Sequence, residues 1–238
     1  MASRLSLRHK IIYAIVLTVL LYAGAIFFPE FIFRHKSQYG RFTIYYHSDT
    51  DTIGLAGVIA KSNSLLQASP LNDIKEQKIF LCSSYREFTF FNPLSSSAFA
   101  VNYPVTQNIF VAKAAIAVDK TSRKGSATQR SLSAVIAHET VHSLLERRLG
   151  YIDYKMLPVW KNEGYCDYIA RESSLSEAEG QEMLCSGKAP KSPSHQYFLY
   201  RKWVGYLIDV KKVSHGAVLI REFNIEETGV AAREAFCK

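Results

Sequence analysis

Residues 137–150, AHETVHSLLERRLG, carry the pattern that organises the rest of this 238-residue chain. Side chains that can face inward recur every three or four positions through the surrounding segment, at Val135, His138, His142, Leu145 and Leu149. This spacing predicts a helix over about residues 130–149, with both histidines on its inward face. Gly150 then stands where a glycine commonly ends a helix.

The same helix contains the pattern H-E-x-x-H. His138 and His142 lie four residues apart, so their Cβ atoms are roughly 6 Å apart on one helix face and both rings can bind one Zn²⁺ ion. Glu139 lies about 100° around the helix from His138, where it can act on a zinc-bound water as general base. The alternative is a surface helix that carries two histidines and no metal.

A third protein ligand has to come from another element, because a catalytic zinc site keeps its fourth position open for water. Glu163 is the candidate, on a second helix predicted over about residues 158–172, with Pro158 in its first turn. Asp167 faces the same way one turn later, where its carboxylate can accept the second ring N–H of a ligand histidine. We therefore expect one zinc ion per chain.

Two stretches together, HETVH and the later LPVWKNEGYCDYIA of residues 157–170, resemble the gluzincin metallopeptidases. These are the thermolysin-like His-His-Glu class, and the likeness is closer to their small bacterial domains. It covers residues 132–171. The resemblance implies that His138, His142 and Glu163 are the zinc ligands, that Glu139 is the base, and that Asp167 orients a ligand histidine.

The resemblance also implies an α+β, zincin-like fold of two lobes, in which a mixed sheet with helices precedes the metal helix and a helical lobe follows it. The strand in NIFVAK, residues 108–113, would be the sheet edge along which a peptide lies. Asn162 and Cys166 depart from the family pattern, where more apolar or small residues are expected.

In gluzincins a Tyr or His of the second lobe usually stabilises the oxyanion. The candidates here are His195, Tyr197, Tyr200 and Tyr206, of which we expect Tyr197 and Tyr200 to be best placed on their helix. For any one of them, ordinary packing is the alternative.

Local patterns predict the other elements. Strand-type runs lie at residues 42–46, 78–82, 98–103 and 108–113. Helices are expected at about 52–67, 84–90, 176–184, 195–212, 215–223 and 228–237, with Ser194 as an N-cap. The polar residues 119–129 are expected to form a loop.

The N-terminus carries an uncharged apolar run, Ile11–Phe28, behind Arg4, Arg8 and Lys10, and it is long enough to span a bilayer. A cleaved signal peptide is the alternative, because Ala23-Gly24-Ala25 offers small residues at the spacing that signal peptidase accepts. Large apolar residues continue past that point and favour an uncleaved anchor.

We therefore expect residues 1–36 to be a short cytoplasmic tail and a single transmembrane anchor. Residues 37–238 are expected to form the metallopeptidase domain, held outside the cytoplasm at the membrane, or secreted if the anchor is cleaved.

Charge and cysteine usage narrow the function further. The formal net charge is +8, but the basic residues are scattered and form no aromatic-interleaved stripe, so we expect no nucleic-acid partner. Cys82, Cys166, Cys185 and Cys237 lack the paired spacing of a structural zinc site. They could make two disulfides in any of three pairings, or none.

These patterns favour a zinc metallopeptidase that hydrolyses a peptide or protein substrate. The alternative is a catalytically silent zinc domain with a binding or assembly role at the membrane. Glu139 favours the enzyme, because a structural zinc site needs no base and usually closes its fourth position. Substrate preference and oligomeric state stay open.

Overall fold

A five-stranded mixed sheet forms the N-terminal half of the body in the computed structural model, which describes residues 6–73, 75–95 and 97–237. Its strand order is β1 (His35–Tyr39), β2 (Phe42–Tyr46), β3 (Gln77–Leu81), β5 (Ile109–Val111), β4 (Ala100–Asn102). The three central strands are parallel, and β1 and β4 pair antiparallel to them at the two edges. The predicted α+β class is confirmed.

The edge of this sheet nearest the helix that carries His138 and His142 is β4, so the prediction that NIFVAK is the edge strand is wrong. That segment forms β5, which lies between β3 and β4. The preceding strand folds back antiparallel, with Ala100 opposite Val111 and Asn102 opposite Ile109, and so covers the side of β5 that would have been free. Strand order is a tertiary property that the local pattern does not contain.

Both faces of the sheet are covered, as is usual for parallel strands. Ile44, Ile79 and Ile109 face a core shared with α2 (Leu55–Leu66) and α4 (Leu132–Leu149). On the other face lies an aromatic core that includes Phe33, Phe80, Phe88, Phe91 and Phe110, against α3 (Tyr85–Phe91). Helix α4, which carries His138 and His142, therefore packs directly against the sheet.

A small second sheet replaces the loop predicted over residues 119–129. It consists of β6 (Ala114–Ala115), β7 (Lys120–Ser122) and β8 (Gln129–Ser131), with the 3₁₀ turn η2 (Ile116–Val118) between the first two. The polar residues that indicated a loop form the β7–β8 turn, in which Gly125 has a φ of +72° that other residues rarely adopt. The strands on either side of this turn, β7 and β8, have three residues each and are too short for an alternating pattern to be visible in the sequence.

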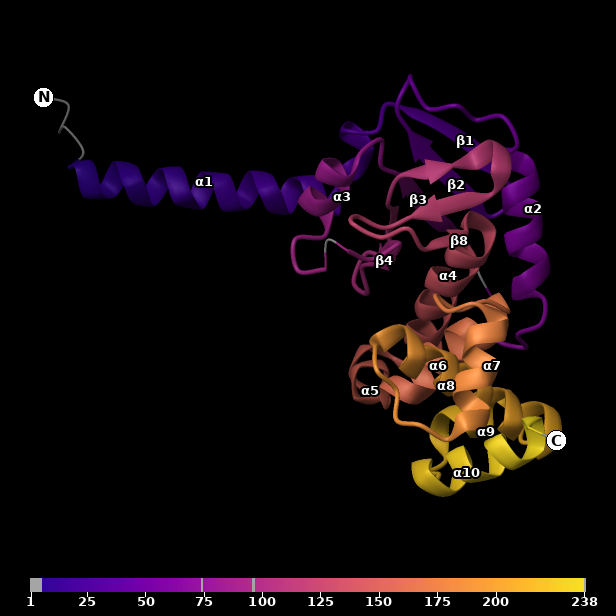
Figure 1. The fold of residues 1–238 in the computed structure, drawn as a ribbon. Coiled ribbons are helices and arrows are strands. Elements are labelled where there is room, and N and C mark those ends of the chain that lie inside the picture. The colour runs from indigo at the N-terminus through magenta and orange to yellow at the C-terminus, as the bar shows by residue number, and fades with distance from the viewer. Residues whose placement is uncertain (1–5, 74, 96, 238) are drawn as a thin grey trace, which may run out of the picture.

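Helices make up the C-terminal half, at the opposite end of the body from the sheet (Figure 1). They are α5 (Tyr151–Met156), α6 (Val159–Ala170), α7 (Glu177–Ser186), α8 (Pro193–Gly205), the π turn η3 (Tyr206–Val210), α9 (His215–Ile220) and α10 (Ile225–Phe236). The start of α8 is capped by Ser192, whose hydroxyl accepts from the His195 amide, and not by Ser194. Pro193 explains the shift, since it suits the first turn of a helix.

Helix α6 packs closely against α8 because Gly164 has no side chain. A Cβ at this position would lie 2.6 Å from the backbone oxygen of Tyr200. The glycine directly after Glu163 thus lets α8 approach the helix that carries this carboxylate.

One disulfide joins Cys185 at the end of α7 to Cys237 after α10. Cys82 and Cys166 are free thiols and both are buried. Of the pairings that the sequence left open, the fold therefore forms only the bridge that ties the C-terminus to the helical lobe.

The N-terminal helix α1 (Leu7–Phe27) projects from the body (Figure 1) and is long and apolar enough to cross a membrane, as an anchor or a signal sequence. Arg4 of the predicted tail lies outside the described residues. The last turns of α1 pack on the domain: Ile26 is buried, and the Tyr22 hydroxyl donates to the Phe90 carbonyl. The domain boundary predicted after residue 36 falls inside β1.

Candidate metal centre

His138 and His142 face each other on the buried length of α4. Their Nε2 atoms lie 3.1 Å apart, and both side chains are almost completely buried. Every residue of α4 from Leu132 to Glu146 is buried, because the sheet covers one side of the helix and the C-terminal helices cover the other. The amphipathic pattern thus places the histidines inward in a helix that is enclosed on nearly all sides.

Glu163 from α6 completes this arrangement. Its Oε2 lies 3.4 Å from Nε2 of His138, and its Oε1 lies 3.7 Å from Nε2 of His142. Two imidazole nitrogens and a carboxylate therefore converge on one point from two helices. Nitrogen and oxygen ligands at about 2.0–2.2 Å from a shared ion would be separated by distances of this order.

The outer side of the His138 ring is held by Asp167. Its Oδ1 lies 2.8 Å from Nδ1 of His138, and it also accepts from Arg130 at 3.0 Å. Burial would raise the pKa of Asp167, but the charges of Arg130 and His138 outweigh it and hold the pKa below its usual value. Sequence reasoning missed Arg130, which arrives from β8, outside the two motif helices.

The outer side of the His142 ring is held differently. Oδ1 of Asn162 lies 3.0 Å from its Nδ1, and the Tyr154 hydroxyl and the Cys166 thiol each lie 3.3 Å from the same atom. An amide oxygen can only accept, so Nδ1 is the donor in the contact with Asn162. Asn162, Tyr154 and Cys166 thus surround this side of the ring.

The electrostatics of the centre favour a cation between the rings. A neutral imidazole whose Nδ1 donates to an acceptor has its lone pair on Nε2, and here the two Nε2 atoms point at each other and at the Glu163 carboxylate. Burial would lower the pKa of His138, but the negative charges of Asp167 and Glu163 raise it to about 10, so this ring holds a proton at neutral pH that a bound ion would displace. For Glu163 burial would raise the pKa, and His142 and His138 lower it.

A second grouping of the same region is His138, His142 and Cys166, whose ligand atoms all lie within 4.8 Å of one another and which could hold a metal ion. Cys166, however, contacts Nδ1 of His142, on the opposite side of the ring from the nitrogen that faces His138. A ligand thiol must ionise, and burial followed by the nearby Glu163 raises the pKa of Cys166 well above its usual value. The position between the Nε2 atoms and Glu163 is therefore the better one for a divalent ion.

A cavity of about 520 Å³ opens onto this centre, between the sheet and the helical lobe. Glu139 lines it beside both histidines, and so do β4 and the segment between α3 and β4. Tyr154 of α5 and Tyr197 of α8 line it from the helical side.

The other predicted oxyanion donors lie elsewhere. The Tyr200 ring packs against Trp203, with centroids 5.3 Å apart, and Tyr200 is not among the described residues that line the cavity. His195 accepts from the Lys191 amide through Nδ1. Tyr206 is buried in the core of the helical lobe. Of the four candidates, Tyr197 alone lines this cavity.

No protein-family model matches the chain, and no curated protein matches it. The chemistry open to this site therefore follows from its own side chains.

Proposed function

We propose that the protein is a zinc-dependent metallopeptidase with a zincin-like fold, of the gluzincin type. The observation that carries the proposal is the convergence of both histidine Nε2 atoms and the Glu163 carboxylate within 3.1–3.7 Å, while Asp167 and Asn162 hold the far side of each ring. Three protein ligands with an open side toward a cavity are typical of a catalytic zinc site.

A zinc ion held by these three residues would lower the pKa of a water toward about 7 and polarise the scissile carbonyl. Glu139, which lines the cavity, takes the proton of the attacking water and passes it to the leaving amine. Asp167 and Asn162 keep the two imidazoles in the tautomer whose Nε2 carries the lone pair.

Tyr197 is the proposed donor to the oxyanion. Burial, together with the negative charges of Glu163 and Asp167, raises the pKa of its hydroxyl. It therefore keeps its proton at neutral pH and can donate a hydrogen bond into the cavity.

The edge strand β4 is the proposed support for an extended peptide. Ala100, Val101 and Asn102 line the cavity, and no other strand of the described residues pairs with the outer side of β4, where an extended peptide would add to the sheet. The Asn102 amide donates to the Glu139 carbonyl at 3.1 Å and to the Ser143 hydroxyl at 2.8 Å. The edge is thereby fastened to the helix that carries the proposed base.

We propose that α1 stays attached as a single membrane anchor, with the domain outside the cytoplasm. The Cys185–Cys237 disulfide supports an oxidising compartment. Cleavage after Ala25 would remove Tyr22, which stacks edge-on against Phe90 with centroids 5.2 Å apart. Secretion after cleavage is the alternative, and the mass of the mature chain distinguishes the two.

The test compares three full-length proteins for bound zinc and for cleavage of a mixed peptide library. Wild type is expected to bind one zinc and to cleave, Glu139→Gln to bind zinc without cleaving, and Glu163→Ala to bind zinc much more weakly. Zinc binding in wild type without cleavage would favour the silent zinc domain. Absence of zinc in wild type would overturn both functions.

A further inference from the structure

The free length of α1 is too short for a bilayer. Its side chains are exposed from Leu7 to Leu21 and become partly covered by the domain from Tyr22 onward. At about 1.5 Å per residue the exposed part that carries no charge, Ile11 to Leu21, measures about 16 Å, whereas the hydrocarbon core of a bilayer is about 30 Å thick. The uncharged part of the helix approaches that thickness only when its last turns, from Tyr22 to Phe27, are included.

Those last turns are docked on the domain. Ile26 belongs to the aromatic core of the sheet, and Tyr22 contacts Phe90 of α3 through both its ring and its hydroxyl. When these turns lie at membrane depth, the domain surface beside them lies there too. The face of the domain around the exit of α1 therefore has to tolerate lipid.

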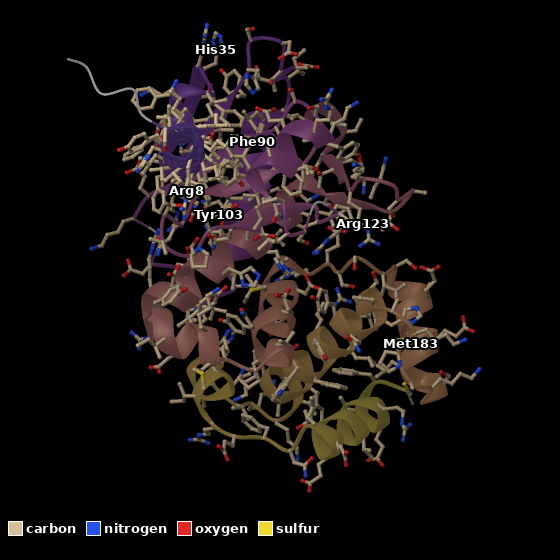
Figure 2. All side chains as sticks on the ribbon, turned by 90° about the vertical axis from the view of Figure 1, so that its left-hand side faces the viewer. Arg8, His35, Phe90, Tyr103, Arg123 and Met183 are labelled. Atoms are coloured by element: carbon tan, nitrogen blue, oxygen red, sulfur yellow. A yellow bond between two sulfur atoms is a disulfide. The ribbon has the colours of Figure 1, made fainter. Side chains whose placement is uncertain are left out.

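That face is apolar. Exposed apolar side chains occur at the end of α1 and just after it, at Phe27, Phe28 and Phe31. Others occur on α3, which Tyr22 contacts, and just after it, at Phe90 and Leu94. We call these five side chains the apolar collar. Phe31 is 85% exposed and Leu94 is 98% exposed, which is costly in water for side chains of this size. Figure 2 looks onto this face with α1 toward the viewer and shows Phe90 beside the helix.

The collar is continuous with the rim of the cavity. Leu94 lies in the segment between α3 and β4, which projects toward the side from which α1 leaves (Figure 1). In the same segment Asn92, Ser95 and Ser97 line the cavity that holds the metal centre. Arg123, another lining residue, borders the space between the two lobes on the face that Figure 2 shows.

We propose that the apolar collar inserts into the bilayer that α1 spans and so holds this rim of the cavity at the level of the lipid headgroups. The occupant of the collar is lipid, because the collar continues the apolar surface of α1 and supplies the missing depth. Combined with the proposed peptidase activity, the geometry makes membrane-proximal peptide segments the substrate class. The insertion itself rests on α1 being a membrane anchor and not on the activity.

The experiment measures tryptophan quenching in the full-length chain. Wild type, Leu94→Trp and the control Ile220→Trp are placed in vesicles of phosphatidylcholine and phosphatidylglycerol, with or without bromine on the acyl chains. Ile220 is also an exposed apolar side chain, 73% accessible, but it lies in the helical lobe. Wild type supplies the background from Trp160 and Trp203.

The emission added by Leu94→Trp is expected to fall by at least half in brominated vesicles, whereas that added by Ile220→Trp stays unchanged. The contrary result is equal emission from Leu94→Trp in both kinds of vesicle, in a chain that floats with the vesicles. It would contradict insertion of the collar but not the role of α1 as an anchor. A chain that does not float with the vesicles would overturn anchor and collar together. Neither result bears on the proposed zinc binding or peptide cleavage, which the separate assays test.

Discussion

Oδ1 of Asn162 lies 3.0 Å from Nδ1 of His142, on the side of the ring that faces away from Glu163. The contact orients a proposed ligand through a neutral amide, whereas His138 is oriented by the carboxylate of Asp167. The two imidazoles therefore differ in donor strength, because a carboxylate partner makes a ligand histidine more basic than an amide does.

Asn162→Ala is expected to weaken zinc binding by about 10- to 100-fold, since Nδ1 of His142 loses its acceptor. Competition with a chelator of known affinity measures the change. Asn162→Asp restores an acceptor and is expected to recover the affinity. Equal weakening in both variants would show that the residue acts only through packing.

Gly164→Ala is expected to destabilise the protein by about 1–3 kcal/mol, because the added methyl would meet the Tyr200 carbonyl and push α8 away from α6. Zinc affinity should fall as well, because Glu163 precedes this glycine on α6 and would be displaced with it. Gly216→Ala is the matched control in α9, where a Cβ meets nothing within 4 Å. Denaturant unfolding of both variants gives the comparison.

The charge of Asp119 is expected to make the stability of the protein fall at low pH. Its carboxylate accepts from the Ser133 amide and hydroxyl, both at 2.7 Å, and from Lys61 at 2.7 Å. Burial would raise the pKa of Asp119, but these hydrogen bonds outweigh it and lower the pKa. A lowered pKa in the folded state means stability that is present above the unfolded pKa, near 3.9, and is lost as the pH falls through the folded value.

Asp119→Asn keeps a residue that tolerates the positive φ of +51° but removes the charge. The free energy of unfolding of wild type should exceed that of this variant by about 1 kcal/mol at pH 7, and the difference should shrink toward pH 3. Urea unfolding at the two pH values measures it. A difference that does not change with pH would contradict the role of the carboxylate charge.

Loss of the Cys185–Cys237 bridge, which closes a separation of 52 residues, is expected to cost about 4 kcal/mol through the entropy of the unfolded chain. The Cys185→Ser, Cys237→Ser double variant tests this by thermal unfolding. Reductant should lower the melting temperature of wild type and leave that of the double variant unchanged.

A peptide joined to lipid through a short spacer is expected to be cleaved several-fold faster than the same peptide on a long spacer, by the full-length protein in the same vesicles. Both substrates have the same anchor, so only the height of the scissile bond above the bilayer differs. Faster cleavage on the long spacer would place the cavity away from the headgroups. Absence of cleavage on both would count against the peptidase and not against the collar.

Several elements could be predicted from the sequence because they depend on local spacing. The helix over residues 130–149 is confirmed as α4, and the run at 42–46 is confirmed as β2, since side-chain period alone defines a helix face or a buried strand. The separation of four between His138 and His142 puts them on one face, and Glu163 lies on a helix that follows after a short connection.

The elements that could not be predicted depend on partners distant in the chain. Residues 119–129, expected to form a loop, belong to a hairpin because β7 pairs with β8. The edge strand is β4 and not β5, because β4 folds back antiparallel on β5.

The N-cap of α8 is a different case, because its cause is local. The cap is Ser192 and not Ser194, and Pro193, which suits the first turn of the helix, was visible in the sequence.

By itself the sequence determined the H-E-x-x-H helix, the apolar N-terminal span and the candidate set His138, His142, Glu163 and Asp167, because helical periodicity and composition are properties of consecutive residues. Only the tertiary structure decided which cysteines pair, that Arg130 and Asn162 support the proposed ligands, and that the collar and the cavity share a rim. Those relationships join residues tens of positions apart, and packing of the whole chain decides which of them come within hydrogen-bonding distance.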